Sequence, residues 1–418
     1  MTSSRLTDRW AAEWLARLVV AALGLRLLLF AAAAARAPSD GFVAYYTAAR
    51  LLREGQPVSR FYDNDWFRAQ VNRINPAVSD IYNVNPPTTV LLMLPLAWLD
   101  HDTARVGWVS LSIIILGASL AFVMRQLHLS GVAGLLFLGL VFVYQPLFAN
   151  LKHGQAYIFL LGLLALAWYG HRRGRPTLFG SALGSLLILK TAGAMLWLLP
   201  AIGRKWRVVV VGLGVVLGVA LASLPWIGLE AWRTYLPLLA GLTARPETAV
   251  PAYQTVMSFF RHLFTYDPQW NPAPLWLAPV LGQALPWLVI VVMLAASGYT
   301  VLRGAEADLA FALFAIASVV LTPVSLDYHY TLLLMPIAIL IAWAGRQASA
   351  WPWIVLAAGA ALIAADLPYN SPRVAVGALA LLAYPKLYGA GLLWALAWWA
   401  SRRSWRPAAA PPAAAGAQ

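Results

Sequence analysis

The stretch HRRGRPTLFGSALGSLLILKTAGAMLWLLPAIGRKWR, residues 171–207, holds a long apolar run between two basic clusters. A helix needs about 20 apolar residues to cross a bilayer, so the run at 176–200 is long enough to cross once. Basic loops stay in the cytoplasm, and the clusters 171–175 and 204–207 are therefore expected on the same side. The run must then enter the membrane and return, which predicts two half-helices that meet near Lys190.

The composition points to a membrane protein. Hydrophobic residues make up 61% of the 418 residues and charged residues only 11%, more apolar surface than a soluble domain of this size needs. The net charge of +14 comes from short basic clusters between apolar runs, as the positive-inside rule expects. We therefore expect no nucleic-acid partner and an all-α polytopic integral membrane protein.

The sequence lacks the residue patterns that usually bind a metal ion or a redox group. It has no cysteines, which excludes disulfides, thiolate metal sites and cysteine nucleophiles. The six histidines lack the paired spacing of a histidine-built metal site. We expect neither a metal nor a cofactor.

Ten apolar segments are long enough to be full spans. With the stretches 86–99 and 176–200 as re-entrant or short helices, we expect about 10–12 transmembrane helices and both termini in the cytoplasm. Residues 1–405 should form a single transmembrane domain, and the Ala/Pro-rich tail 406–418 should be disordered. The candidate spans lie at about 10–36, 103–124, 131–148, 155–170, 206–228, 274–302, 307–322, 329–345, 351–366 and 374–400.

The first outer region, residues 37–102, holds seven of the sixteen acidic residues. Acids are costly near lipid, so their concentration favours a functional role. Within it, 42–53 has the apolar spacing of an amphipathic juxtamembrane helix, with Asp40 at the N-cap position and Gly55 at the C-terminal stop. Asp40 is then either a helix cap or a general base at the membrane surface.

Lys190 stands in the middle of an apolar run. An unpaired lysine there costs about 2.5–3.5 kcal/mol, and its distance from both flanks is too great for snorkelling. We expect an anionic partner, and a lipid phosphate suits an ammonium group.

Three polar outer corners supply further candidates: YNVNPP (82–87), KHGQAY (152–157) and SLDYHY (325–330). Each corner also fits a polar turn or an interfacial aromatic belt with no site role. The candidate side chains in them are Asn85, His153, Gln155, Asp327 and His329.

The order of motifs resembles glycosyltransferase family 87 over about residues 10–345. The motifs are D…YYTAARLLREGQP…Y…NPPTTVLLMLPLAWL, GQ, LGSLLILK…LLPAIGRKWR, YQTVMSFFRHLF and LTPVSLDYHY…LLLMPIAIL. The resemblance implies a GT-C-type fold and a hexosyltransferase that moves a sugar, expected to be mannose, from a polyprenyl-phosphate donor. The acceptor would be a lipid or glycan on the extracytoplasmic face of the cell membrane, the anomeric centre would invert, and Asp40 matches the catalytic aspartate.

Elementary chemistry agrees with that implication. A phosphate is a good leaving group, so a single carboxylate that removes the acceptor proton suffices. Cations must hold the phosphate, and aromatic rings can stack on sugar faces. The expected substrate-binding residues are Tyr45, Tyr46, Arg50, Asn85, His153, Gln155, Lys190, Gln254, Asp327 and His329.

Two other functions stay open. A secondary transporter or a lipid or glycan flippase also uses half-helices and a midplane lysine, although the sequence shows no internal pseudo-symmetry. A glycan polymerase or ligase would favour a longer outer loop.

Overall fold

The computed structural model describes residues 3–82 and 85–403, so the predicted tail 406–418 lies outside the described residues. Within those ranges the regular secondary structure is helical, apart from one isolated bridge between Asp267 and Asn271. The all-α membrane fold expected from the sequence is confirmed.

Five helical segments of the described chain are long and apolar enough to cross a membrane, or seven if two bent pairs count as one span each. The five are α1 (Ser3–Ala34), α4 (His101–Leu127), α10 (Trp206–Ile227), α13 (Pro279–Leu302) and the segment Asp327–Ala344, which joins η7 (Asp327–Leu333) to α15 (Leu334–Ala344).

The bent pairs turn by 44° and 55°, and three shorter apolar helices complete the bundle. Apart from α8, which belongs to the broken run 176–200, these helices together with α7 (Tyr157–Arg172) lie at the positions of the ten predicted spans. The pairs are α5 (Gly131–Val143) with α6 (Gln145–His153) and η8 (Gly377–Ala383) with α17 (Pro385–Arg403); the shorter helices are α8 (Pro176–Lys190), α14 (Ala307–Val320) and α16 (Trp351–Ala364).

The apolar run around Lys190 is broken where the sequence predicted. Helix α8 ends at Lys190, and the chain reverses through Thr191 and Gly193, which have positive φ angles of 51° and 72°. It returns through the short segments η4 (Ala194–Trp197) and α9 (Leu198–Ile202) before α10 begins.

The stretch 86–99 does not cross the membrane either, as expected. It forms two short 3₁₀ segments, η2 (Pro87–Leu92) and η3 (Leu94–Leu96). The Thr88 hydroxyl donates a hydrogen bond to the carbonyl of Ile188, and the Thr89 hydroxyl donates to the carbonyl of Leu189 at 2.7 Å. No further helical turn donates N–H groups to the last carbonyls of α8, so the threonine hydroxyls satisfy these open acceptors.

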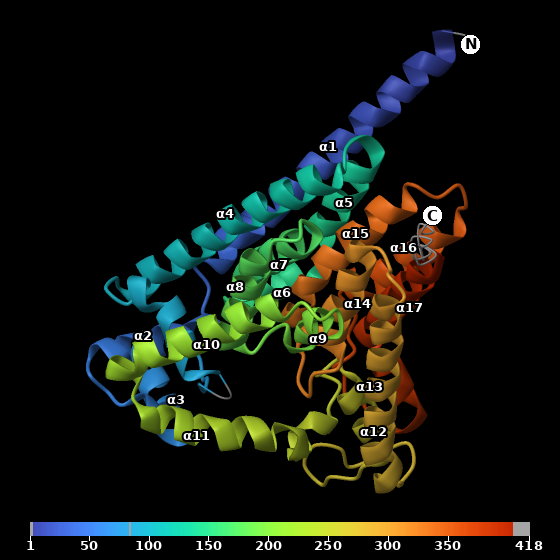
Figure 1. Cartoon of the computed structure of the whole chain (residues 1–418). Helices are drawn as coiled ribbons and strands as arrows, with labels where there is room; N and C mark the ends of the chain where they lie inside the picture. Colours follow the sequence, from blue (N-terminus) through green and yellow to red (C-terminus); the bar gives the residue numbers. More distant parts are fainter. Residues whose placement is uncertain (1–2, 83–84, 404–418) are drawn as a thin grey trace, which may run out of the picture.

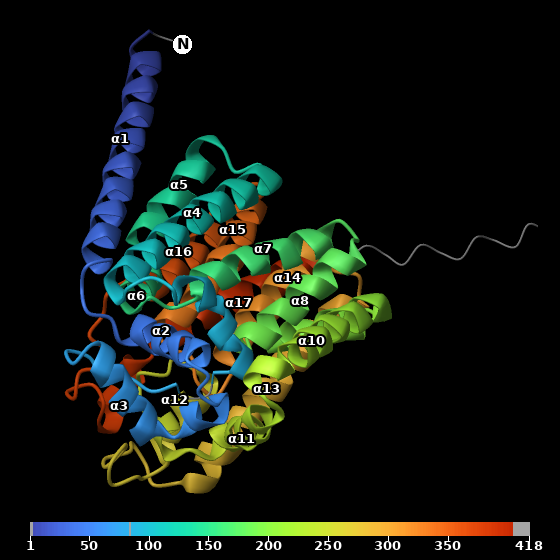
Figure 2. The ribbon, with the colours of Figure 1, turned by 90° about the vertical axis from the view of Figure 1, so that its left-hand side faces the viewer.

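The first outer region folds against the end of the bundle. Figures 1 and 2 show α2 (Asp40–Arg53) and α3 (Asn64–Ile74) at the same end as α11 (Leu229–Ala240) and α12 (Val256–Phe264). The short segments η1 (Val58–Tyr62), η5 (Gly241–Ala244) and η6 (Pro246–Ala249) connect these helices.

Helix α2 is more buried than an amphipathic surface helix. Ten of its fourteen residues are buried, in a hydrophobic cluster separate from the main core of the bundle. Phe42 and Phe61 of this cluster are fully buried, and Trp108 of α4 is 1% exposed. The spacing of its apolar residues predicted the helix but not that other segments cover nearly all of it.

Helices α8 and α10 lie side by side (Figures 1 and 2) and approach most closely at glycines. A Cβ atom on Gly184 would lie 2.6 Å from the carbonyl oxygen of Gly212, and one on Gly180 would collide with the carbonyl of Val208. Small residues let helix backbones approach in this way within membranes.

We expect Gly184→Ala to destabilise the protein by about 1–3 kcal/mol, because the added methyl group forces the two backbones apart. Gly218→Ala on α10 is the matched control: its Cβ would meet nothing within 4 Å, so the gain in helix propensity should leave stability unchanged or higher. Thermal unfolding in detergent measures both. Equal melting temperatures for the two variants would contradict the close contact.

Candidate active site

Asp40 is the first residue of α2, and Ser39 occupies the N-cap position. The predicted capping role of Asp40 is therefore wrong. Its Oδ1 accepts a hydrogen bond from the Gly41 amide at 3.0 Å and lies 2.5 Å from Nδ1 of His153. Because capping does not hold the carboxylate at the helix end, it is available to His153 and to solvent.

The Asp40–His153 pair lies at the surface of the site, with side chains 54% and 30% exposed. Burial by itself would raise the pKa of Asp40, but the hydrogen bond to His153 and the charge of His153 outweigh it. The pKa of Asp40 is thus held below its ordinary value. An ionised carboxylate that still reaches solvent can accept a proton from an incoming hydroxyl group.

Tyr45 connects Asp40's helix to two other candidates. Its hydroxyl donates to Oε1 of Gln155 at 2.5 Å, and its ring centre lies 4.8 Å from the ammonium of Lys190. Lys190 also donates a hydrogen bond to Oδ1 of Asn85. Within residues 3–82 and 85–403, Lys190 has no carboxylate at ion-pair distance, so a neutral amide and an aromatic face hold the cation.

His329 joins the site through stacked rings. Its ring centre lies 4.2 Å from that of Tyr157 and 4.9 Å from that of Tyr328. Tyr328 in turn lies 6.1 Å from the ring of His153. These contacts bring the corner 325–330 against the corner 152–157.

Contacts therefore connect seven of the eleven predicted residues, which come from five separate parts of the sequence. The connected set, which we call the Asp40 cluster, is Asp40, Tyr45, Asn85, His153, Gln155, Lys190 and His329.

Tyr46 and Arg50 lie elsewhere on α2. The Tyr46 hydroxyl donates to the carbonyl of Leu99 at 2.7 Å, and Arg50 pairs with Glu54 at 3.1 Å. Successive residues of a helix point about 100° apart, so Tyr45 and Tyr46 cannot both face the cluster. The sequence prediction grouped them because they are adjacent.

Gln254 and Asp327 belong to a second network around Lys386. The ammonium of Lys386 lies 3.4 Å from Asp327, which also accepts a hydrogen bond from Tyr369. Gln254 accepts the Lys386 amide at 3.1 Å and donates to the carbonyl of Ala383 at 2.7 Å. These contacts tie the start of α17 to η7 and to the loop before α12, so we describe both residues as bracing this end of the fold.

The sequence prediction omitted three residues that face the cluster: Asp80, Tyr157 and Tyr328. The rings of the two tyrosines form the aromatic wall beside His329. Burial, together with the charge of Asp40, raises the pKa of Asp80 to about 7, although Lys190 and His153 act in the opposite direction. Asp80 was one of seven acids in the first outer region, and no local pattern distinguished it.

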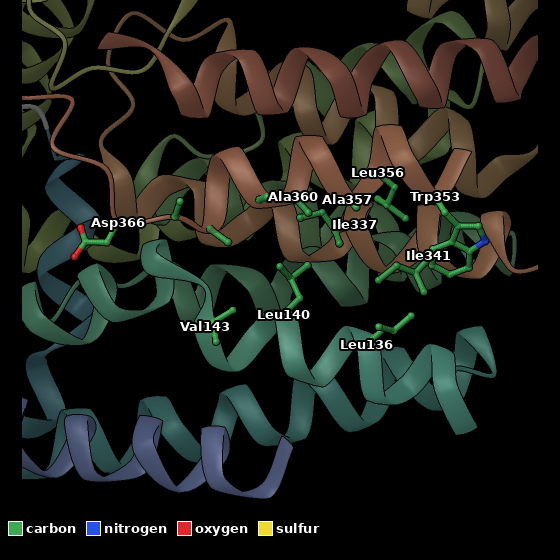
Figure 3. A pocket seen from close by; sticks show the side chains of 13 residues that line it. Leu136, Leu140, Val143, Ile337, Ile341, Trp353, Leu356, Ala357, Ala360 and Asp366 are labelled. Atoms are coloured by element: carbon green, nitrogen blue, oxygen red, sulfur yellow. The ribbon is translucent and has the colours of Figure 1, made fainter. Parts of the chain in front are cut away.

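An apolar groove of about 530 Å³ lies between α5, α15 and α16 (Figure 3). Figure 3 shows Asp366 at one end and Trp353 toward the other, with Leu140 and Ile337 between them. Apart from the carboxylate of Asp366 and the ring nitrogen of Trp353, the side chains that line it are hydrocarbon. The groove therefore presents a single carboxylate, Asp366, in an otherwise apolar lining and contains none of the predicted site residues.

We expect Asp80 to lower stability as the pH rises. Its pKa is 3.8 in an unfolded chain and about 7 in the fold, so folding favours the protonated form and this contribution is lost between those values. The melting temperature of Asp80→Asn relative to the original protein should increase over that pH range and then level off. Asp65→Asn, at a carboxylate that is 94% exposed, should show no such trend. A constant difference for Asp80→Asn would contradict the raised pKa.

Comparison with known proteins identifies the family. A profile of glycosyltransferase family 87 matches residues 83–336, more than half of the chain. Two curated relatives, each named alpha-(1->3)-arabinofuranosyltransferase, come from Mycobacterium tuberculosis strains CDC 1551 / Oshkosh and ATCC 25618 / H37Rv. Each is 29% identical over 172 residues, and the match covers 39% of this chain and 39% of the relative. The chain thus matches well under two thirds of their length. This chain, with several helices long and apolar enough to cross a membrane, belongs to glycosyltransferase family 87.

Proposed function

We propose that the protein transfers a sugar from a polyprenyl-phosphate donor to a hydroxyl group of a lipid or glycan, with inversion and with Asp40 as the general base. The observation that carries the proposal is the Asp40–His153 pair at 2.5 Å, which lies in the same cluster as Lys190, a lysine that makes no ion pair with a carboxylate of the described residues. This reaction needs two groups, a base that takes the proton of the acceptor hydroxyl and a cation that binds the phosphate.

In the proposed step, the acceptor oxygen attacks the anomeric carbon as Asp40 takes the hydroxyl proton. The bond between the anomeric carbon and the phosphate oxygen breaks, and the phosphate leaves with the electron pair. His153 supports this chemistry because its hydrogen bond and charge keep Asp40 ionised and oriented.

Lys190 is the proposed phosphate ligand. Its present partners, Asn85 and the ring of Tyr45, are neutral, so an incoming phosphate would supply the missing negative charge. The position of Lys190 at the C-terminal end of α8 places its charge where the first outer region meets the bundle.

The sugar would lie against the aromatic wall of Tyr157, Tyr328 and His329, because aromatic rings stack on the apolar faces of sugars. Mannose is the donor sugar that the sequence motifs favour. The names of the two relatives make arabinofuranose the second candidate, in which case the enzyme would be a pentosyltransferase rather than a hexosyltransferase.

We place the active face on the extracytoplasmic side of the cell membrane. The basic clusters 171–175 and 204–207 both flank the broken run at α8 and support a cytoplasmic position for its two ends. The first outer region, with Asp40, would then face away from the cytoplasm, where nucleotide sugars are absent and lipid-linked sugars serve as donors. Family membership favours this transferase over the transporter or flippase alternative.

Single cysteines can test the proposed orientation because the chain contains none. On intact cells, a membrane-impermeant thiol reagent should label Asp65→Cys, at a position that is 94% exposed. Thr177→Cys and Gly203→Cys should be labelled only after permeabilisation. Labelling of Thr177→Cys but not Gly203→Cys on intact cells would show that 176–200 crosses once and would reject the orientation.

Replacing Asp40 with Asn tests the mechanism. Asn keeps the size of the side chain but cannot take the proton, so we expect kcat to fall by about 100- to 10,000-fold. The assay follows transfer of label from polyprenyl-phosphate mannose, polyprenyl-phosphate arabinofuranose or a nucleotide sugar to a cell-envelope lipid extract. Asp65→Asn, on the exposed face of α3, should keep full activity. Turnover of Asp40→Asn near that of this control would remove Asp40 from the mechanism, and use of the nucleotide sugar alone would reject the donor class.

A further inference from the structure

Arg105 of α4 is a buried cation outside the Asp40 cluster. It is 2% exposed, and a single nitrogen, Nη2, donates hydrogen bonds to three carbonyl groups. These belong to Ala34 at 3.0 Å, Leu151 at 2.8 Å and Lys152 at 3.0 Å.

The three carbonyls mark two helix ends. Ala34 is the last residue of α1, and Leu151 and Lys152 lie in the last turn of α6. The final carbonyls of a helix lack partners within the helix, and a positive charge near them is favourable. Arg105 therefore joins the ends of α1 and α6 to the second turn of α4.

The residue that follows Lys152 is His153, the partner of Asp40. Gly154 then turns the chain with a φ of 61°, and a Cβ atom there would collide with Nη1 of Arg105 and lie 2.6 Å from Cβ of Phe42. The guanidinium also lies 5.2 Å from the ring centre of Phe42. Arg105 thus contacts the His153 corner on one side and α2, which carries Asp40, on the other.

The contact between the corner and α2 is equally tight at Gly41. A Cβ atom at Gly41 would collide with the carbonyl of His153 and with the amide of Gln155. Trp108, three residues after Arg105, donates to the carbonyl of Gly154 at 2.8 Å. Side chains of α4 therefore set the distance between the corner and the start of α2.

Burial of this guanidinium is costly. Its Nε and Nη1 have no hydrogen-bond partner among the described residues, and a buried donor without a partner destabilises a fold. An apolar side chain of similar size would often be as stable or more stable. The stability of the fold therefore does not explain why position 105 is an arginine. Its hydrogen bonds to three carbonyl groups, which hold those groups in place, do explain it.

We propose that Arg105 is a positioning residue that holds His153 at hydrogen-bonding distance from Asp40. The inference rests on the proposed role of Asp40 as the general base, and Arg105 itself need not touch the substrate. Removal of its charge should let the corner 152–155 move, so the base loses its orientation while the donor phosphate, held at Lys190, is still bound.

Two substitutions of Arg105 distinguish a role in positioning His153 from a role in packing. Arg105→Met keeps the apolar stem and removes the three hydrogen bonds, so we expect kcat to fall by about 10- to 100-fold, the effect of an ångström-scale misplacement. The KM for the donor should change little. Arg105→Lys supplies one nitrogen with three donor protons, and because one nitrogen makes all three bonds in the structure, it should restore much of kcat.

A cross-linking measurement reports how close residues 40 and 153 lie and does not depend on sugar transfer. In the cysteine-free chain, Asp40→Cys with His153→Cys should react rapidly with a short thiol-to-thiol cross-linker. Adding Arg105→Met should slow this reaction severalfold, and adding Arg105→Lys should restore it. The control pair Asn85→Cys with Lys190→Cys should cross-link at one rate in all three backgrounds.

The outcomes distinguish the two proposals. An unchanged rate for the 40–153 pair in Arg105→Met overturns the positioning role, whatever the activity. An equal slowing of the control pair also overturns it, because the effect would then be a general loss of structure. Slowing confined to the 40–153 pair supports the positioning role, and a lack of sugar transfer with any donor by the protein without these substitutions would separately reject the proposed function.

Discussion

The structure depends on one constraint: backbone that stops being helical at membrane depth must still find hydrogen-bond partners. Helix α8 stops at Lys190, and the open carbonyls of Ile188 and Leu189 take the hydroxyls of Thr88 and Thr89. This contact ties the stretch 86–99, near the end of the first outer region, to the broken helix. Because Asn85 directly precedes that stretch and contacts Lys190, the same constraint brings the outer region and the lysine into one site.

A second hydrophobic core gives the outer region its rigidity. Helix α2 is buried on nearly all sides, in a cluster separate from that of the bundle. General bases on flexible loops lose orientation, whereas side chains on a packed helix keep it. The site thus combines Asp40 on the packed helix α2, the corner after α6 and Lys190 at the end of α8, three elements brought together only by the tertiary fold.

The parts of this arrangement that could be predicted from sequence are those with a local cause. The length of the apolar runs predicted the spans. Lys190, in an apolar run between two basic clusters, predicted the break at the end of α8. Tyr45 and Tyr46 are adjacent in sequence, and only the helix orientation in the fold separates their roles. Arg105 could not be identified, because the carbonyls it binds come from residues 46, 47 and 71 positions away. Asp80 acquires its high pKa from burial by distant segments, which also leaves no local signal.

The two glycines at the contact between α2 and the His153 corner also limit how the enzyme can diversify. A Cβ atom at Gly41 would collide with the backbone carbonyl of His153, and one at Gly154 would collide with the side chains of Arg105 and Phe42, so neither position has space for a longer side chain. Under the proposed function, a relative that handles a bulkier or slimmer sugar would then have to change the aromatic wall formed by Tyr157, Tyr328 and His329. That wall could vary in evolution while the glycine contacts beside Asp40 stay fixed.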